Sequence, residues 1–315
     1  MAAERDLDIS FGVTIRQIQI FVVTAESGSI TIAAERLYLS QTAVSLALSQ
    51  LEKTLGATLM VRRRAHGITL TSTGRSLLPM GRNILANVAE FQEEAQDATE
   101  TTGTVTIGCF PSLGPGLLPG LIEKFQEDHP SARLNFIEAA HEDLMTMVET
   151  GTLDLVMAYD IGLPAGLQEM LIDTCIPGVL LSAKHPLAVS GKAVSIQELV
   201  DEPFILLDSP TSAEHARMIF HNTGVRPEVK FRSQNFETVR SLAGRGLGWS
   251  ITLQRPQTDI SHEGAAVRIL DLKDEEIRPV RVVAVWSPEL TLGRATKAFL
   301  KTLQQETSSR THREN

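Results

Sequence analysis

The chain has 315 residues, 43% hydrophobic and 21% charged, a balance typical of a soluble globular protein with two or three domains. Its two cysteines, Cys109 and Cys175, are too far apart for a CxxC pair or a disulfide framework, and no apolar run approaches the roughly 18 residues of a membrane span. The acidic segment MAAERDLDIS is not a signal peptide, so we expect a cytoplasmic protein.

The net charge of −9 is unevenly distributed along the chain. Residues 14–75 carry seven Lys and Arg against three Asp and Glu, a net charge of +4, which leaves −13 on the rest of the chain. The total charge argues against a nucleic-acid partner, whereas its distribution indicates a small basic module attached to an acidic body.

Three short helices are predicted in this basic module. Apolar residues at spacings of three and four predict a helix over 15–25, and the Ser-Gly-Ser sequence at 27–29 ends it before a second helix over 30–37. Ser40 is a suitable N-cap for a third helix, because apolar residues follow it at steps of four, three and four.

Another face of the third helix carries short uncharged polar side chains. With the N-cap, this reading face comprises Ser40, Gln41, Thr42, Ser45 and Ser49. Two short helices joined by a tight turn, the second with such a face near its N-terminus, are typical of a helix-turn-helix motif. Hydroxyls and amides of this length can approach base edges in the major groove of DNA. The alternative, for this helix alone, is an ordinary solvated face that lacks charge.

The segment MVRRRAHGITLTSTG, residues 60–74, predicts a β-hairpin wing with a turn at Gly67. Arg62, Arg63 and Arg64 stand at its base, and the hairpin contains no acidic residue. Arginines beside a helix-turn-helix can neutralise phosphates and fix the register on DNA without specifying sequence. The alternative is a solvated run of charges.

A single long helix is predicted from Gly74 to Ala98. Steps of four and three define a heptad seam, namely Leu77, Gly81, Ile84, Val88, Phe91, Ala95 and Ala98. The simplest partner for this seam is the same helix of a second subunit, since a dimer presents two reading faces to two half-sites. The alternative is that the helix packs against its own chain.

The order of these segments resembles the LysR-type transcriptional regulators of bacteria. The resemblance rests on TIRQIQIFVVTAESGSI, on AAERLYLSQTAVSLALSQLEKTLGATLMVRRR and on GITLTSTGR before the long helix, and it extends from Thr14 to about Thr302. It implies a regulator with a winged helix-turn-helix, a linker helix and a two-lobed effector domain like a periplasmic binding protein, commonly assembled as a homotetramer. Many members carry Arg or Lys near Leu46 or Ser49, so phosphate anchoring here rests on the wing arginines and Arg36.

Strands and helices alternate in the rest of the chain, which predicts parallel α/β units. The first set has strands at 104–110, 133–137 and 153–159 and helices at 117–128 and 142–150. The second set has strands at 178–182, 204–207, 229–231 and 249–252 and helices at 212–223 and 236–244. A strand at 281–286 and a helix at 292–303 return to the first unit.

The predicted fold class is therefore α/β: a winged helix-turn-helix over 1–73, a linker helix over 74–100, and an effector domain over 101–305. Within the effector domain, lobe 1 takes 101–174 and 280–305 and lobe 2 takes 175–279. We expect the tail 306–315 to be disordered.

Ligands of open α/β sheets bind where strand carboxyl ends meet helix N-termini. Residues predicted at such positions are Phe110, Pro111 and Ser112 in lobe 1, and Ser209, Thr211, Ser212, Asn235, Phe236 and Thr238 in lobe 2. His141, Tyr159 and Asp160 are candidates for the rim. The alternative for each hydroxyl is a plain N-cap. Ser112 and Thr211, one from each lobe, are the main candidates to bind a small polar or weakly acidic metabolite.

Other functions have less support in the sequence. There is no GxSxG, HExxH or P-loop, GPGLLPG at 114–120 lacks GxGxxG spacing, and the eight histidines lack metal-ligand spacing. We therefore expect no enzyme, metal or cofactor. A solute-binding module would leave the first hundred residues without a role. A thiol redox-responsive regulator using Cys109 and Cys175 is the main alternative, although buried cysteines are usually inert and this pair lacks close spacing.

Overall fold

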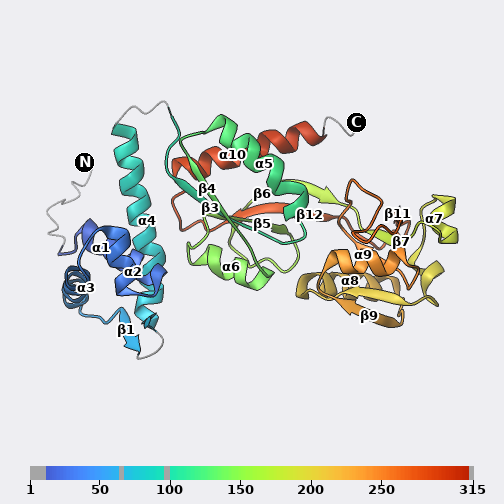
Figure 1. Ribbon diagram of the computed structural model, residues 1–315, viewed down its shortest axis with the longest axis horizontal. Helices are drawn as coiled ribbons and strands as arrows, with labels where there is room; N and C mark the ends of the chain where they lie inside the picture. Colours follow the sequence, from blue (N-terminus) through green and yellow to red (C-terminus); the bar gives the residue numbers. More distant parts are fainter. Residues whose placement is uncertain (1–11, 64–66, 96–99, 312–315) are drawn as a thin grey trace, which may run out of the picture.

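The computed structural model describes residues 12–63, 67–95 and 100–311, which form three units in a row (Figure 1). The N-terminal unit lies at one end, lobe 1 lies in the middle and lobe 2 at the other end, with the linker helix α4 between the N-terminal unit and lobe 1. None of the described helices is long and apolar enough to cross a membrane.

The N-terminal unit is the predicted winged helix-turn-helix. Its elements are α1 Ile15–Ser27, α2 Ile30–Leu37, α3 Gln41–Leu55, β1 Met60–Arg63 and β2 Gly67–Leu70, and the linker helix α4 Ser72–Ala95 follows them. Local signals define the helix ends: Gly28 ends α1 with a left-handed φ of 61°, and the Ser40 side chain accepts a hydrogen bond from Ala43 N at the start of α3. Strands β1 and β2 pair antiparallel, and Ile68 N donates to Gly28 O (2.9 Å), which attaches the wing to the α1–α2 turn.

Lobe 1 is built around a five-stranded sheet in the order β4-β3-β5-β12-β6. The strands are β3 Thr104–Cys109, β4 Arg133–Glu138, β5 Leu155–Tyr159, β6 Gln168–Cys175 and β12 Val280–Trp286. Helices α5 Gly114–Asp128 and α10 Arg294–Thr311 lie on one face and α6 His141–Glu149 on the other (Figure 1). Strand β3 runs parallel to β4 and β5, whereas β12 is antiparallel to both neighbours because it returns from lobe 2.

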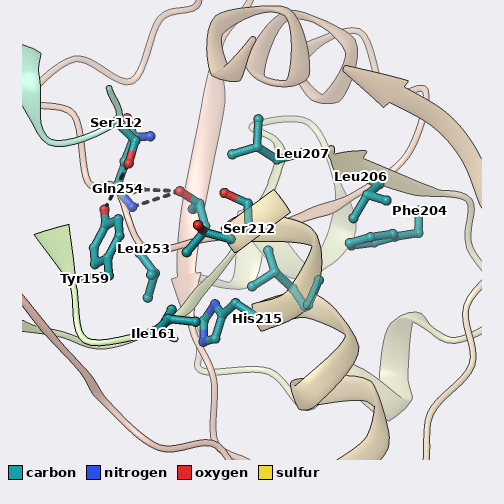
Figure 2. A pocket seen from close by; sticks show the side chains of 14 residues that line it. Ser112, Tyr159, Ile161, Phe204, Leu206, Leu207, Ser212, His215, Leu253 and Gln254 are labelled. Atoms are coloured by element: carbon teal, nitrogen blue, oxygen red, sulfur yellow. Dashed lines mark hydrogen bonds between the residues drawn. The ribbon is translucent and has the colours of Figure 1, made fainter. Parts of the chain in front are cut away.

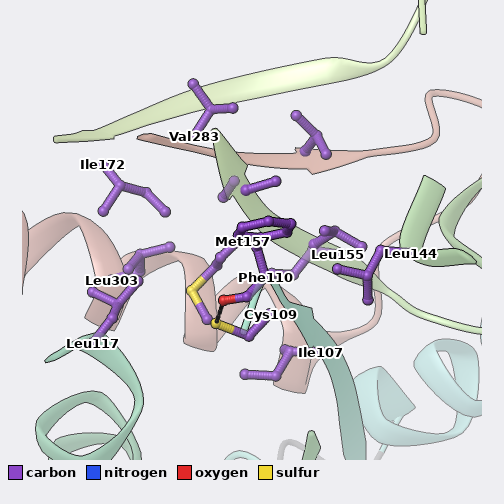
Figure 3. Packing of buried hydrophobic residues seen from close by; sticks show 14 of the residues in the cluster. Ile107, Cys109, Phe110, Leu117, Leu144, Leu155, Met157, Ile172, Val283 and Leu303 are labelled. Carbon is purple, nitrogen blue, oxygen red and sulfur yellow. Dashed lines mark hydrogen bonds between the residues drawn. The ribbon is translucent and has the colours of Figure 1, made fainter. Parts of the chain in front are cut away.

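The core of lobe 1 is apolar and combines aliphatic, aromatic and sulfur-containing side chains (Figure 3). Cys109, Met157 and Leu155 are fully buried, and Leu303 brings α10 into the same cluster. This packing helps α10 to extend to Thr311, because its first turns are fixed in the core and later residues continue an existing helix. The predicted disordered tail is therefore wrong for residues 306–311, while 312–315 lie outside the described residues.

Lobe 2 has two small sheets. Strands β7 Gly178–Ser182, β10 Ser250–Thr252 and β11 Val267–Asp271 form one in the order β10-β7-β11, and β8 Phe204–Leu207 pairs with β9 Val229–Ser233. A parallel bridge between Phe204 and Trp249 joins the two sheets. The helices are α7 Pro186–Ser190, a 3-10 turn at Ile196–Leu199, α8 Pro210–Thr223 and α9 Phe236–Gly244.

The expectation of parallel units is only partly right for lobe 2. Strand β7 is antiparallel to both β10 and β11, and only β8 and β9 form a parallel pair of strands in the described part of this lobe. Two strands, β6 and β11, were not predicted. Only one of the eight residues of β6 is buried, so the strand lacks the continuous apolar run that marks a central strand.

Candidate functional site

The reading face lies on the outside of the N-terminal unit. Its partner face, formed by Val44, Leu48 and Leu51, is buried against the other helices, which turns Gln41, Thr42 and Ser49 outward as exposed residues. Ser45 is half-buried, and the Ser40 hydroxyl is engaged as the N-cap (3.1 Å to Ala43 N). The fold thus presents a helix face of hydroxyls and amides, and the prediction of Ser40 as the N-cap of this helix is confirmed.

Two further residues extend this surface, and the sequence patterns missed both. Tyr38 is 95% exposed in the turn between α2 and α3, where its φ of 54° makes it the one left-handed residue besides glycine in the described chain. Leu46 is 58% exposed on α3. The signal for both was an apolar or aromatic residue outside the 3.6-residue stripe.

The cations predicted to contact phosphates are only partly visible. Arg36 is exposed at the end of α2, on the same unit as the reading face. The side chains of Arg62 and Arg63, and the whole of Arg64, lie outside the described residues, so their prediction stands as made.

The two halves of the heptad seam on the linker helix α4 lie in different surroundings, the first packed against α1 and the second largely exposed. Leu77 packs into the core of the N-terminal unit, and Gly81 faces α1 so closely that an added Cβ would lie 3.0 Å from Val22 Cγ2. The alternative that the helix packs on its own chain is therefore correct for this half. Farther along, Ile84 and Phe91 are exposed, and they border an open apolar groove of about 440 Å³. This linker groove is lined by Ile15, Ile84, Asn87, Val88, Phe91 and Gln92.

The linker helix is also bonded to lobe 1. The Arg82 side chain, 14% exposed, donates from Nε to Glu26 Oε1 (3.0 Å) in α1 and from Nη1 to Thr150 O (2.7 Å) at the end of α6. Its Nη1 also donates to Thr152 Oγ1 (3.1 Å). One guanidinium therefore joins the N-terminal unit, the linker and the effector domain.

A cavity lies between the lobes (Figure 2). Four of the predicted ligand residues line it, namely Ser112 and Tyr159 from lobe 1 and Thr211 and Ser212 from lobe 2. This interlobe cavity is also lined by His215, Thr252 and Gln254 and by an apolar set, Ile161, Phe204, Leu206, Leu207, Ala216, Ile251 and Leu253. Its volume of about 30 Å³ has room for about one or two water molecules.

The other predicted ligand residues do not line the interlobe cavity, and most of them make other contacts. The Phe110 ring packs edge-on against Tyr159, Pro111 is exposed, and Asp160 accepts from Arg281 N (3.0 Å). His141 Nε2 bonds with Gly162 O (3.2 Å), and Ser209 donates to Ser212 Oγ (2.8 Å). Asn235 caps α9 by accepting from Thr238 N (3.0 Å), so Phe236 and Thr238 belong to a plain helix start.

The interlobe cavity disfavours charge of either sign. Burial raises the pKa of Tyr159, even though its hydroxyl accepts a hydrogen bond from Ser112 (3.3 Å). Burial lowers the pKa of His215 to about 4, so the imidazole is neutral at physiological pH. Among the described residues that line the cavity there is no Lys, Arg, Asp or Glu.

The two cysteines lie in surroundings that suppress the thiolate. Burial raises the pKa of the Cys109 thiol to about 12, and burial with the nearby carboxylate of Asp173 raises that of Cys175 to about 11. Peroxide reacts with thiolates, and at neutral pH both groups are protonated almost completely.

We therefore expect mild peroxide to leave both cysteines of the folded protein unmodified, as measured by peptide mass spectrometry. The same treatment of urea-unfolded protein, in which the pKa of each thiol returns toward about 8.5, provides the positive control. Sulfenic acid or disulfide at either thiol of the folded protein would support the alternative that this is a thiol redox-responsive regulator.

Comparison with known proteins gives a consistent result. Residues 15–75 match the family model described as bacterial regulatory helix-turn-helix protein, lysR family, and residues 98–308 match the LysR substrate binding domain. The uncharacterized HTH-type transcriptional regulator YvbU of Bacillus subtilis is 30% identical over 76% of this chain and 80% of its own length.

Solved structures agree. The C-terminal domain of a probable LysR family transcriptional regulator from Rhodococcus sp. RHA1 has 37% identity and a TM-score of 0.63, covering 65% of this chain and all of that one. A single-substitution variant of full-length OxyR from Pseudomonas aeruginosa has a TM-score of 0.74 over 93% of this chain and 98% of that one; at 19% identity this likeness concerns the fold alone.

Proposed function

The chain belongs to the LysR family of transcriptional regulators, and from this we propose that a small molecule in the interlobe cavity controls how its dimers and tetramers hold operator DNA. The protein is a transcriptional regulator with a helix-turn-helix DNA-binding domain and an effector-binding domain. We propose a regulatory rather than a catalytic role, in the cytoplasm, where the DNA is.

The observation that carries the DNA interface is the exposed, capped N-terminal part of α3. Gln41 and Thr42 lie on its first turn, where a helix entering the major groove brings side chains to base edges. Amides and hydroxyls can exchange hydrogen bonds with these edges, and the exposed Leu46 offers an apolar contact to a thymine methyl. We propose that Arg36 and the arginines at 62–64 add phosphate contacts.

Replacing Arg62, Arg63 and Arg64 together with alanine should flatten the plot of log affinity against log salt by about 0.9 for each phosphate interaction that the substitution removes. The control is Arg217→Ala, which removes an exposed arginine from α8 in lobe 2 and should leave the slope unchanged. Anisotropy titrations from low to physiological salt measure both slopes. An unaltered slope in the triple variant excludes the wing from the interface.

A second copy of the chain is the proposed occupant of the linker groove. The groove continues the apolar steps of the heptad seam beyond Gly81, with Ile15 at the start of α1 on its border, and the exposed Phe91 would be buried by the same helix of a second copy. The edge strand β4 is a second exposed apolar element, since Phe136 is 49% and Ile137 36% exposed, one on each of its faces. Two separate surfaces support assembly beyond the dimer, to a tetramer.

The effector mechanism follows from the small size of the interlobe cavity. A space for about one or two waters cannot admit a metabolite unless the lobes move apart. A ligand that binds the open arrangement better therefore shifts the population toward it. Because lobe 1 is bonded to α4 through Arg82, such a shift changes the placement of the DNA-binding units and the bend they impose on DNA.

Fluorescence anisotropy tests the regulator directly. The purified protein is titrated against its own upstream intergenic duplex and against a shuffled duplex of equal composition, at physiological salt. We expect tight, salt-dependent binding with a clear preference for the native sequence. Equal affinity for the two duplexes, extended to duplexes covering the neighbouring promoters, would refute operator recognition.

A further inference from the structure

His215 is a mostly buried polar side chain whose ring lines the interlobe cavity. It lies in the second turn of α8, is 7% exposed, and projects into the space between the lobes (Figure 2). Within the part of the chain that the structure describes, neither ring nitrogen makes a hydrogen bond and neither is fully enclosed, so both are accessible from the cavity that the ring lines. The imidazole can therefore bond to a molecule that enters the cavity.

The cavity beside this ring supplies hydrogen bonds but no ionic partner. A neutral imidazole offers one donor and one acceptor, and the Ser112, Tyr159 and Thr211 hydroxyls lie on the same cavity. At the start of α8, the amides of Thr211 and Ser212 have no intrahelical carbonyl to bond, so they add donors. Thr252 and Gln254 add two uncharged polar residues, and the rest of the lining is aliphatic and aromatic.

A carboxylate would be poorly accommodated in these surroundings. The full charge would face only the partial charge of the α8 N-terminus, about half an elementary charge, and would lose its water shell to aliphatic side chains. The side chains of the cavity are themselves kept uncharged, since burial raises the pKa of Tyr159 and lowers that of His215. An amide or alcohol avoids this cost and still uses the donors and the imidazole.

Resting on the proposed function, we propose that His215 determines effector choice by hydrogen-bonding an uncharged amide or hydroxyl group on a compact apolar molecule, and that the interlobe cavity selects such molecules over the matching carboxylates. This narrows the effector from any small polar or weakly acidic metabolite to an uncharged one. A site built to hydrogen-bond a particular group discriminates strongly against analogues that cannot make that bond.

Matched pairs of probes test this selection. Benzamide and benzoate share one shape, as do isobutyramide and isobutyrate, and each pair differs in charge. Calorimetry and thermal shift on the full-length protein should show at least one amide binding at millimolar concentration, at least tenfold more tightly than its carboxylate. A carboxylate that binds as tightly as its amide, or no binding by any of the four, overturns the inference.

Variants then assign the selection to the imidazole. His215→Leu should weaken amide binding at least tenfold, and His215→Gln, which keeps a donor and an acceptor, should restore part of it. His221→Leu is the matched control, because His221 is exposed on the same helix. Unchanged amide binding in His215→Leu overturns the role of the imidazole, and the thermal melt of that variant verifies its folding.

Operator binding, measured by anisotropy on the same samples, separates the two proposals. If the protein prefers its operator but binds the carboxylates as tightly as the amides, the inference about His215 is wrong and the proposed regulatory function is retained. If the protein selects amides but shows no preference for its operator, the binding role of His215 is supported and the proposed function is refuted.

Discussion

Replacing Ile84 and Phe91 together with aspartate is expected to convert the protein to monomers and to lower its operator affinity by about 100-fold or more. Both side chains are exposed on the linker groove, 41% and 77% respectively, and a dimer would bury them against a second copy. Burying two carboxylates without partners costs several kcal/mol, which exceeds the stability of a modest interface. A monomer brings one reading face to DNA and loses the gain from binding two half-sites at once.

Light scattering after size exclusion measures the assembly state, and anisotropy measures the operator affinity. Ala89→Asp serves as the control, because Ala89 is exposed on α4 outside the seam and should tolerate the charge without dissociation. A dimer that survives the double substitution would show that another surface joins the subunits and that the groove has a different occupant.

Replacing Arg82 with alanine is expected to release the N-terminal unit from lobe 1. The substitution removes the hydrogen bonds to Thr150 O and Thr152 Oγ1 and the ion pair with Glu26. Hydrogen bonds from a charged group contribute about 2 kcal/mol, which corresponds to a shift of roughly 30-fold toward the undocked arrangement. Asn83, which bonds with Glu289 O and Thr291 N, then remains as the principal polar contact.

Hydrogen exchange measures this release. We expect the amides of residues 287–291 and of the last turn of α6 to exchange at least tenfold faster, while those of α1–α3 keep their protection. Arg82→Lys should be intermediate, since it keeps the charge but loses the planar fork. Lys124→Ala, which removes an exposed pair with Asp128, is the control. Unchanged exchange in Arg82→Ala would mean that the two units are held by other contacts.

The DNA-binding half of the molecule was largely predictable from the sequence because its signals are local. The spacing of Val44 and Leu48 and the cap at Ser40 act within four residues, so the patterns gave α2 at 30–37 and the start of α3 at Gln41 as the structure has them. Within the interlobe cavity, Ser112 and Thr211 were found by a rule of topology, that strand carboxyl ends meet helix N-termini.

Other features depended on contacts between distant residues. The seam at Leu77 and Gly81 is identical in pattern to the seam at Ile84 and Phe91, yet one half packs on α1 and the other stays open. In the sequence Arg82 looks like any other polar residue of a helix, and only the folded structure shows that it donates a hydrogen bond to Thr150 O of lobe 1.

Local patterns were sufficient to predict the helix-turn-helix, the wing, the α/β class and the two hydroxyl residues of the cavity, because helix caps, apolar periodicity and the order of elements are properties of neighbouring residues. The assembled fold was needed to show that His215 lacks a partner among the described residues, that β7 runs antiparallel, and that both thiols are protonated. Hydrogen-bond satisfaction, strand direction and desolvation depend on which distant segments meet, and no local pattern of residues specifies that.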